Sequence, residues 1–326
     1  MDRFIYEDGR VVLREAFQNL LQKHTRVTLL AHKNADGDTL GTALGLYSLC
    51  KNIGKQVEVC CIDKKLPKNL DFLPHFARIK RQIDFDDSLI IACGASEVGL
   101  FGFDLSSREI MNIDHHKSNT DFGTLNIVDQ TSASTSQVAY KLIQDGFEVT
   151  QSLALCLYVG LLTETENFKT LNVDQDVFLV AAELLAYGID LEEIHRNIYQ
   201  RDALSSLRLL SATLDTLELY EEAEVASFVV TQEMFQQSGS NTTELAGIVD
   251  YGIDLATVKI AILVVEDQEA IKVFLRSKRE DVSSLAKVFG GTGEKLAAEF
   301  SSEKIEIKKL LNKILNEINK KGLLDA

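Results

Sequence analysis

Two short segments hold the residues with the clearest chemical potential. The first, LLAHKNADGDTLGTALGL, is an apolar stretch that ends at His32 and continues through Asp36 and Asp38 into a helical pattern. One imidazole and two carboxylates on a tight turn are ligands suited to Mn²⁺ or Mg²⁺. Gly37 would let the backbone approach a metal or phosphate closely. A simpler interpretation stays open, in which Asp36 only caps the helix and His32 is a satisfied strand end.

The second segment, IMNIDHHKSN, places Asp114, His115 and His116 in succession after another apolar stretch, with Asn119 close behind. Adjacent residues of an extended segment point to opposite sides, so one imidazole could ligate a metal while the other reaches a phosphate oxygen. Core packing does not readily explain two strand ends that each deliver acid and imidazole. Together the segments predict a metal site.

The elements around these segments predict the fold class. Between residues 26 and 114, short apolar runs alternate with amphipathic stretches, which favours an α/β fold with a mostly parallel sheet covered by helices on both faces. Ligands of such sheets bind beyond the carboxyl ends of the strands, where both segments would lie. From Ser134 to about Tyr220 the pattern is helical. Strand patterns then return, and the chain ends in an amphipathic helix, KIEIKKLLNKILNEINKK, which we expect to pack on a core.

The length of 326 residues predicts two domains. We place the first at 1–195, a connecting helix or linker at 196–219, and a smaller domain at 220–326. No apolar run approaches the ~20 residues of a membrane span, and no secretory signal is evident at the start, so a cytoplasmic location is expected.

Composition limits the partners. The formal net charge of −15 disfavours long duplex nucleic acid, whose binding requires neutralising Lys and Arg. A small phosphorylated substrate, held by metal and a few cations, fits better. The five cysteines show no C-x-x-C spacing and are interpreted as reduced core residues.

The order of motifs resembles that of the DHH/DHHA1 phosphoesterases. H-x-x-x-D-x-D is followed by D-H-H-x-S-N, a helix ending in TET, an R-S-K element and the glycine loop VFGGTGEKLAAEF. The resemblance spans Thr28 to Phe300 and is strongest to the oligoribonuclease and pAp-phosphatase (NanoRNase) branch. It implies a parallel-sheet DHH domain and a smaller α/β DHHA1 domain across a cleft. The implied reaction is hydrolysis of short RNA or DNA oligonucleotides or nucleoside 3′,5′-bisphosphates at two Mn²⁺ ions, with Mg²⁺ possible.

The resemblance also implies roles for residues that match the family motifs. The implied metal ligands are His32 and Asp36 for one ion, Asp38 and His115 for the other, and Glu164 at the end of the helix. Asp114 would orient the cluster and His116 would contact the scissile phosphate, so these two form the catalytic pair. The implied substrate-binding residues are Asn119, Arg276, Ser277, Lys278, Gly290, Gly291 and Gly293.

Several positions depart from the family pattern. The strand that should end in a bridging aspartate reads SLIIACGASEVGLFG, and its spacing to Gly102 makes Gly94 the equivalent. Glu164 replaces an aspartate, and Glu294 and Glu299 replace a histidine and a glycine of the loop. Two close cations repel each other, so the missing bridging carboxylate predicts weak binding of the two metal ions.

Three functions therefore stay open. The first is a metal-dependent phosphoesterase, with an activity that the substitutions could impair. The second is a catalytically impaired relative that binds a nucleotide or a protein partner. The third, a pyrophosphatase of the related DHH type, is disfavoured by the R-S-K element and the glycine loop. A homodimer is possible for any of them.

Overall fold

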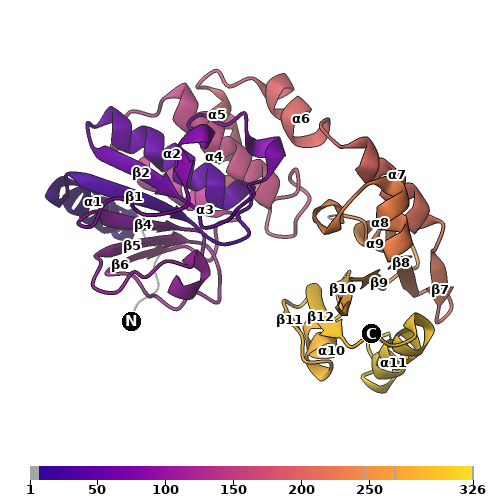
Figure 1. Cartoon of the computed structure of the whole chain (residues 1–326). Helices are drawn as coiled ribbons and strands as arrows, with labels where there is room; N and C mark the ends of the chain where they lie inside the picture. Colours follow the sequence, from indigo (N-terminus) through magenta and orange to yellow (C-terminus); the bar gives the residue numbers. More distant parts are fainter. Residues whose placement is uncertain (1–6, 246, 268, 325–326) are drawn as a thin grey trace. The chain divides into compact units, whose positions relative to one another are not determined.

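The computed structural model describes residues 7–245, 247–267 and 269–324. The chain divides into two compact units, Met1–Arg201 and Asp202–Ala326 (Figure 1). The predicted linker 196–219 contains the end of α6 (Leu191–Tyr199), a break, α7 (Leu204–Leu214) and the start of β7 (Glu218–Tyr220). Two helices thus stand where one connecting helix was expected. The functional assignment of the two domains stays a prediction.

The first unit is built on a six-stranded sheet in the order β3-β2-β1-β4-β5-β6, and all its pairs are parallel. Its strands are β1 (Arg26–Ala31), β2 (Gln56–Cys60), β3 (Ile79–Lys80), β4 (Leu89–Cys93), β5 (Ile110–Asp114) and β6 (Leu125–Val128). Every residue of β4 and β5 is buried, as expected for strands covered on both faces. The order reverses between β1 and β4, and that switch point is the usual ligand site of such sheets. The predicted fold class is confirmed.

The α-helices of this unit pack on one face of the sheet, and loops with one 3₁₀ turn cover the other, where the sequence also predicted helices. The helices are α1 (Glu7–Lys23), α2 (Gly37–Asn52), α3 (Thr135–Ile143), α4 (Gln151–Glu164), α5 (Gln175–Leu185) and α6, with short 3₁₀ turns η1 (Lys68–Leu70), η2 (Phe76–Arg78) and η3 (Val98–Phe101), of which η3 is on the second face. Several begin at a side-chain cap, which satisfies free backbone N–H groups. Asp36, Ser134 and Thr150 cap α2, α3 and α4 in this way.

Helices α2 and α4 meet backbone to backbone because glycine leaves no side chain between them. A Cβ atom at Gly41 would lie 2.5 Å from the Cys156 carbonyl oxygen, and one at Gly37 would lie 2.2 Å from Thr163 Oγ1. Such close approach needs glycine. It sets the first turn of α2, which carries Asp38, against the last turn of α4, which carries Glu164.

The second unit is a six-stranded mixed sheet in the order β11-β12-β10-β9-β8-β7. Its further strands are β8 (Val225–Val230), β9 (Ile260–Glu266), β10 (Ile271–Ser277), β11 (Thr292–Gly293) and β12 (Ala297–Ser302), and only the β8–β9 pair is parallel. Its further helices are α8 (Gln232–Ser238), η4 (Thr242–Glu244), α9 (Asp250–Ile253), α10 (Val282–Val288) and α11 (Ile307–Lys320). The predicted smaller strand and helix domain is therefore present in this part of the chain.

Alternation along its strands gives this unit two cores. Ile262 and Val264 of β9 pack with α10 and α11, whereas Leu263 and Val265 pack with α7 and α8. The terminal helix α11 buries its apolar stripe, at Leu310, Leu311, Ile314, Leu315 and Ile318, as its pattern predicts. No helix in the described part of the chain is both long and apolar enough to cross a membrane.

Candidate metal and phosphate site

The two N-terminal motifs meet beyond the carboxyl ends of the strands of the parallel sheet. His32 follows β1, and Asp38 lies in the first turn of α2. His115 and His116 follow β5, beside the last residue of α4, Glu164. The charges of His32 and His116 affect each other's titration, as do those of His116 and both Asp38 and Glu164. These side chains therefore share one site, although their individual roles remain predictions.

The His32 side of the site is a pair. His32 Nε2 lies 3.6 Å from Asp36 Oδ2, and His32 Nδ1 lies 2.9 Å from the Lys33 carbonyl oxygen. Burial alone would lower the pKa of His32, but the Asp36 carboxylate outweighs it and holds that pKa above its ordinary value. The other oxygen, Asp36 Oδ1, accepts a hydrogen bond from Thr39 N. The helix-cap interpretation is correct for one oxygen and leaves the other facing His32.

Asp38 is held by the start of another helix. Its carboxylate is buried and accepts hydrogen bonds from the backbone N–H groups of Thr135 (2.7 Å) and Ser136 (2.8 Å), the first residues of α3. The positive end of a helix dipole stabilises an anion placed there. This support fixes the Asp38 carboxylate in position, so it does not depend on a metal to stay there.

Asp114, His116 and Asn119 form a hydrogen-bonded group at the end of β5. Asp114 Oδ1 lies 2.7 Å from His116 Nδ1, and Asp114 Oδ2 accepts a hydrogen bond from Asn119 Nδ2 at 2.6 Å. The hydrogen bond with Asp114 raises the pKa of His116 to about 9, so the imidazole is a cation at neutral pH. Burial alone would raise the pKa of Asp114, but the hydrogen bond with His116 outweighs it and holds that pKa below the ordinary value. A cation fixed in this way suits a phosphate oxygen.

Asn119 was predicted to bind substrate, and the structure places it inside the protein. Its amide nitrogen also donates to the Ala95 carbonyl, and its oxygen accepts from Asn112 Nδ2 and Asp121 N. A direct contact with substrate would have to break one of these bonds. Its observed contacts support Asp114 and join the loop after β4 to the loop after β5.

His115 completes the second group of potential ligands. Its Nε2 lies 3.6 Å from Glu164 Oε1 and 4.0 Å from Asp38 Oδ2. These distances are too long for hydrogen bonds. The nitrogen is buried and has no hydrogen-bond partner in the described part of the chain, so this polar atom is left for a ligand. Imidazole between two carboxylates matches the donor chemistry of a divalent ion.

The side chains nevertheless do not form a ready ion cage. Within residues 7–245, 247–267 and 269–324, no three or more His, Cys, Asp or Glu groups are arranged so that they could hold a metal ion. The donors stand instead as a pair at His32 and a looser set at His115. The residues present fit the two halves of a metal centre and provide no ligand shared between them.

Gly94 explains the missing shared ligand. It follows β4 with φ +68°, and its N–H donates to the Ile113 carbonyl at 2.9 Å. A Cβ atom there would lie 2.9 Å from Thr39 Oγ1 and 3.3 Å from Thr135 Oγ1. Thr135 Oγ1 is buried and has no hydrogen-bond partner among the described residues. A side chain at position 94 would therefore enter a polar space beside Asp38.

Sequence reasoning missed one supporting residue. Asp63, which follows β2, accepts a hydrogen bond from Ala35 N at 3.0 Å and so fixes the loop between His32 and Asp36. Its place at the end of a neighbouring parallel strand is the signal that could have identified it.

In the second unit, the R-S-K residues contact their own unit. Arg276 Nε lies 3.4 Å from Asp250 Oδ1 and Nη1 donates to the Leu275 carbonyl. Ser277 Oγ donates to the Glu280 carbonyl, and Lys278 Nζ donates to the Leu255 carbonyl at 2.6 Å. Substrate binding by Ser277 or Lys278 would require these bonds to be exchanged.

The glycines of the predicted phosphate loop have local explanations. Gly290 N and Gly291 N donate to carbonyls of α10, at Lys287 and Ala286. A Cβ atom at Gly291 would lie 2.2 Å from the Glu299 carbonyl oxygen, and one at Gly293 would lie 2.4 Å from Ala298 Cα. Close packing against β12 therefore accounts for Gly291 and Gly293, and Glu294 closes the β11–β12 turn. A phosphate-binding role for this loop stays a prediction.

Comparison with known proteins identifies the class. Residues 26–161, from the start of β1 to near the end of α4, match the model of the DHH family, N-terminal domain. The first unit of the chain is therefore similar to the N-terminal domain of the DHH family. It is 27% identical over 299 residues to the bifunctional oligoribonuclease and PAP phosphatase NrnA of Thermus thermophilus, covering 90% of this chain and 89% of that protein.

Two further comparisons cover most of the chain. The protein of the same name from Bacillus subtilis is 23% identical over 280 residues, covering 83% of this chain and 88% of that protein. The crystal structure of an exopolyphosphatase-related protein from Bacteroides fragilis has a TM-score of 0.87 at 23% identity, covering 99% of this chain and 98% of that one. The similarity to NrnA proteins confirms the predicted branch of the family.

Proposed function

We propose that the chain is a metal-dependent phosphoesterase that hydrolyses short oligonucleotides or nucleoside 3′,5′-bisphosphates. The observation that carries the proposal is the meeting of His32, Asp38, His115 and His116 at the switch point of the sheet, within the matched DHH domain. The names of the NrnA relatives support the substrate class.

The metal in this proposal is Mn²⁺, with Mg²⁺ as the alternative, because a set of imidazole and carboxylate donors accepts either ion. His32 and Asp36 would hold one ion, and Asp38, His115 and Glu164 would hold the other. When bound, such ions neutralise charge on the phosphate and activate water.

The protein residues have roles of their own. His116, kept cationic by Asp114, would bind a non-bridging oxygen of the scissile phosphate and stabilise its growing charge. Asn119 would hold Asp114 in the orientation that keeps the His116 ring in place. The water oxygen bonds to phosphorus as the ester P–O bond breaks, and the proton that the water loses ends on the departing alkoxide. Arg276 in the second unit would bind another part of the substrate.

A cytoplasmic location belongs to the same proposal. Its support is that the five cysteines, Cys50, Cys60, Cys61, Cys93 and Cys156, are buried and unpaired, as is usual for proteins of a reducing compartment.

The test uses the purified full chain with a 5′-phosphorylated diadenylate or adenosine 3′,5′-bisphosphate, over a series of Mn²⁺ and Mg²⁺ concentrations. Products are separated by chromatography. We expect metal-dependent release of AMP, which His116→Gln abolishes. The matched control is His24→Gln. His24 precedes β1, at the amino end of the strands and away from the site, and pairs with Glu109.

A second function is favoured by Gly94, which leaves the two halves of the centre without a shared carboxylate. In that case the chain would bind nucleotide without useful turnover. Binding of the bisphosphate together with no hydrolysis in either metal, at any concentration tested, would select this function over the first.

A further inference from the structure

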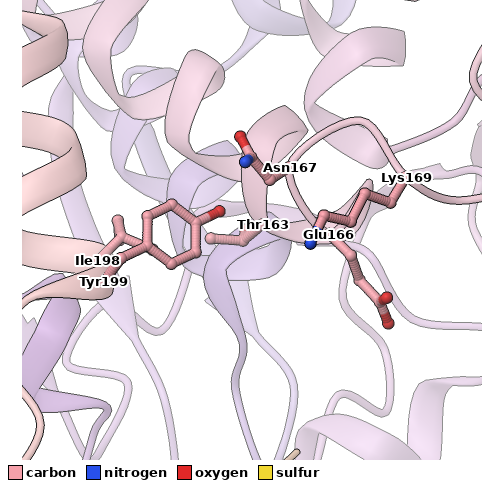
Figure 2. Close-up of a pocket in the computed structure, with 6 residues that line it drawn as sticks. All are labelled: Thr163, Glu166, Asn167, Lys169, Ile198 and Tyr199. Carbon is pink, nitrogen blue, oxygen red and sulfur yellow. The ribbon is translucent and has the colours of Figure 1, made fainter. Parts of the chain in front are cut away.

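A pocket of about 420 Å³ lies beside the end of α4, entirely within the first unit (Figure 2). It is lined by Thr163, Glu166, Asn167, Lys169, Ile198 and Tyr199. Its size falls within the range of small-molecule sites. Tyr199 and Ile198 come from α6, so the pocket brings together two segments that are separate in the sequence.

The loop on one side of the pocket is held in an unusual conformation. Glu166, Asn167 and Phe168 all have positive φ, at 47°, 62° and 64°. Backbone strain of this kind persists only where the surroundings enforce it. Here Asn167 N donates to the Leu162 carbonyl at 2.8 Å, and the Phe168 ring stacks on Phe178. The loop therefore has a fixed shape that presents Asn167 to the pocket.

Three side-chain hydrogen-bond donors line the pocket. In the described part of the chain, the Lys169 ammonium, the side-chain amide of Asn167 and the Tyr199 hydroxyl make no hydrogen bond or ion pair with another residue. In Figure 2 the Lys169 ammonium is directed toward Thr163 and Tyr199, whereas the Glu166 carboxylate points away from them.

The pocket borders the candidate metal and phosphate site. Thr163 immediately precedes Glu164, whose carboxylate lies 3.6 Å from His115 Nε2. Thr163 also packs directly against Gly37, between Asp36 and Asp38. A substrate with one phosphate at His116 could thus extend along the end of α4 into the pocket.

We propose that this pocket binds a second phosphate group of the substrate, one that is not hydrolysed. The proposal rests on the proposed function and narrows it to substrates with two phosphates. One cation and two neutral donors form a suitable set for phosphate oxygens, and charge-assisted hydrogen bonds of this kind are the stronger ones. The fixed loop reduces the ordering cost of binding.

The test measures binding by isothermal titration calorimetry with a chelator present, so that no turnover takes place. The ligands are adenosine 3′,5′-bisphosphate and adenosine 3′-monophosphate, which lacks the phosphate proposed to bind here and carries only the one that would be hydrolysed. We expect the full chain to prefer the bisphosphate, and Lys169→Gln to reduce that preference about tenfold, the size of one lost charge-assisted contact. Lys169→Arg should retain the preference. Asn167→Asp, which keeps the loop shape but replaces a donor by an anion, should also reduce it.

The matched control is Lys51→Gln, which removes the same charge from the opposite end of α2. Equal losses in Lys169→Gln and Lys51→Gln would attribute the effect to net charge and overturn the proposal. An equal loss of affinity for adenosine 3′-monophosphate and for the bisphosphate would place Lys169 at the hydrolysed phosphate and overturn the proposal too, as would a full chain that shows no preference for the bisphosphate. If the preference behaves as expected but neither compound nor a dinucleotide is ever hydrolysed with metal, the proposed function fails and this phosphate site stands.

Discussion

The neighbouring strands β4 and β5 are both completely buried, but they differ in the side chains at their carboxyl ends. They pair in register from Ile90 with Ile110 to Cys93 with Ile113, and both are buried throughout. Strand β5 ends in an acid, Asp114, and two imidazoles follow, of which His116 is hydrogen-bonded to Asp114. After β4 comes Gly94, which has no side chain. The fold depends on the apolar residues inside the strands, whereas the chemistry depends on the one to three residues beyond them, so one can change without the other.

The β5 end offers the largest predicted effect. Asp114→Asn removes the charge that keeps His116 protonated, and we expect kcat to fall about a hundredfold, as for loss of one oxyanion donor. The pKa of His116 should return toward its ordinary value of 6.5 from about 9. Stabilisation from the Asp114–His116 pair is present below pH 6.5 and is lost as pH rises through about 9. Titration of the His116 ring by NMR checks this, and an unchanged pKa would contradict it.

The β4 end should respond in the opposite direction. Gly94→Asp adds a carboxylate beside Asp38, and we expect Mn²⁺ to bind about tenfold more tightly and hydrolysis to increase. The φ of +68° is unfavourable for a non-glycine residue, so thermal unfolding should show a loss of roughly 1 kcal/mol. Gly94→Asn is the control, since it has the same shape without the charge. Tight binding of two ions by the unsubstituted chain would show that another residue bridges them.

Arg276 lies in the second unit and belongs to the end of neither β4 nor β5. Its substitution by alanine tests the loss of a substrate contact alone. We expect KM to rise about fivefold while kcat changes little, because uniform binding is removed. Steady-state kinetics with a dinucleotide provide the measurement, and Arg208→Ala, an exposed position on α7, serves as control. An unchanged KM would remove Arg276 from the substrate site.

Glu164→Asp should have the smallest effect. The shorter side chain restores the residue that the family pattern has at this position, and alone it should change Mn²⁺ affinity less than about tenfold. Combined with Gly94→Asp, its effect should be non-additive because both residues would act on one ion cluster. Calorimetry on the two single variants and the double variant tests this, and strictly additive free energies would argue for separate sites.

Much of this site could be predicted because its residues follow strands of one parallel sheet. The type of His116 and its place after an apolar run were enough to predict that it lies near His32. The hydrogen bonds of Asn119 were not predictable, because they depend on Asn112 and Ala95 from other parts of the sheet. Tyr199 was missed for a similar reason, since only the packing of α6 brings it beside α4. The sequence also could not reveal that the Lys278 ammonium contacts backbone carbonyls.

The glycine contacts between α2 and α4 have a mechanical consequence. Main chain touches main chain at Gly41, and side chain touches main chain at Gly37, so the two helices cannot slide or separate without losing that fit. Asp38 and Glu164 are consequently mounted on a single stiff block. A methyl group added at either glycine would force α2 and α4 apart, and the carboxylates of Asp38 and Glu164 would move apart with their helices. No rotation of the side chains alone could restore their separation.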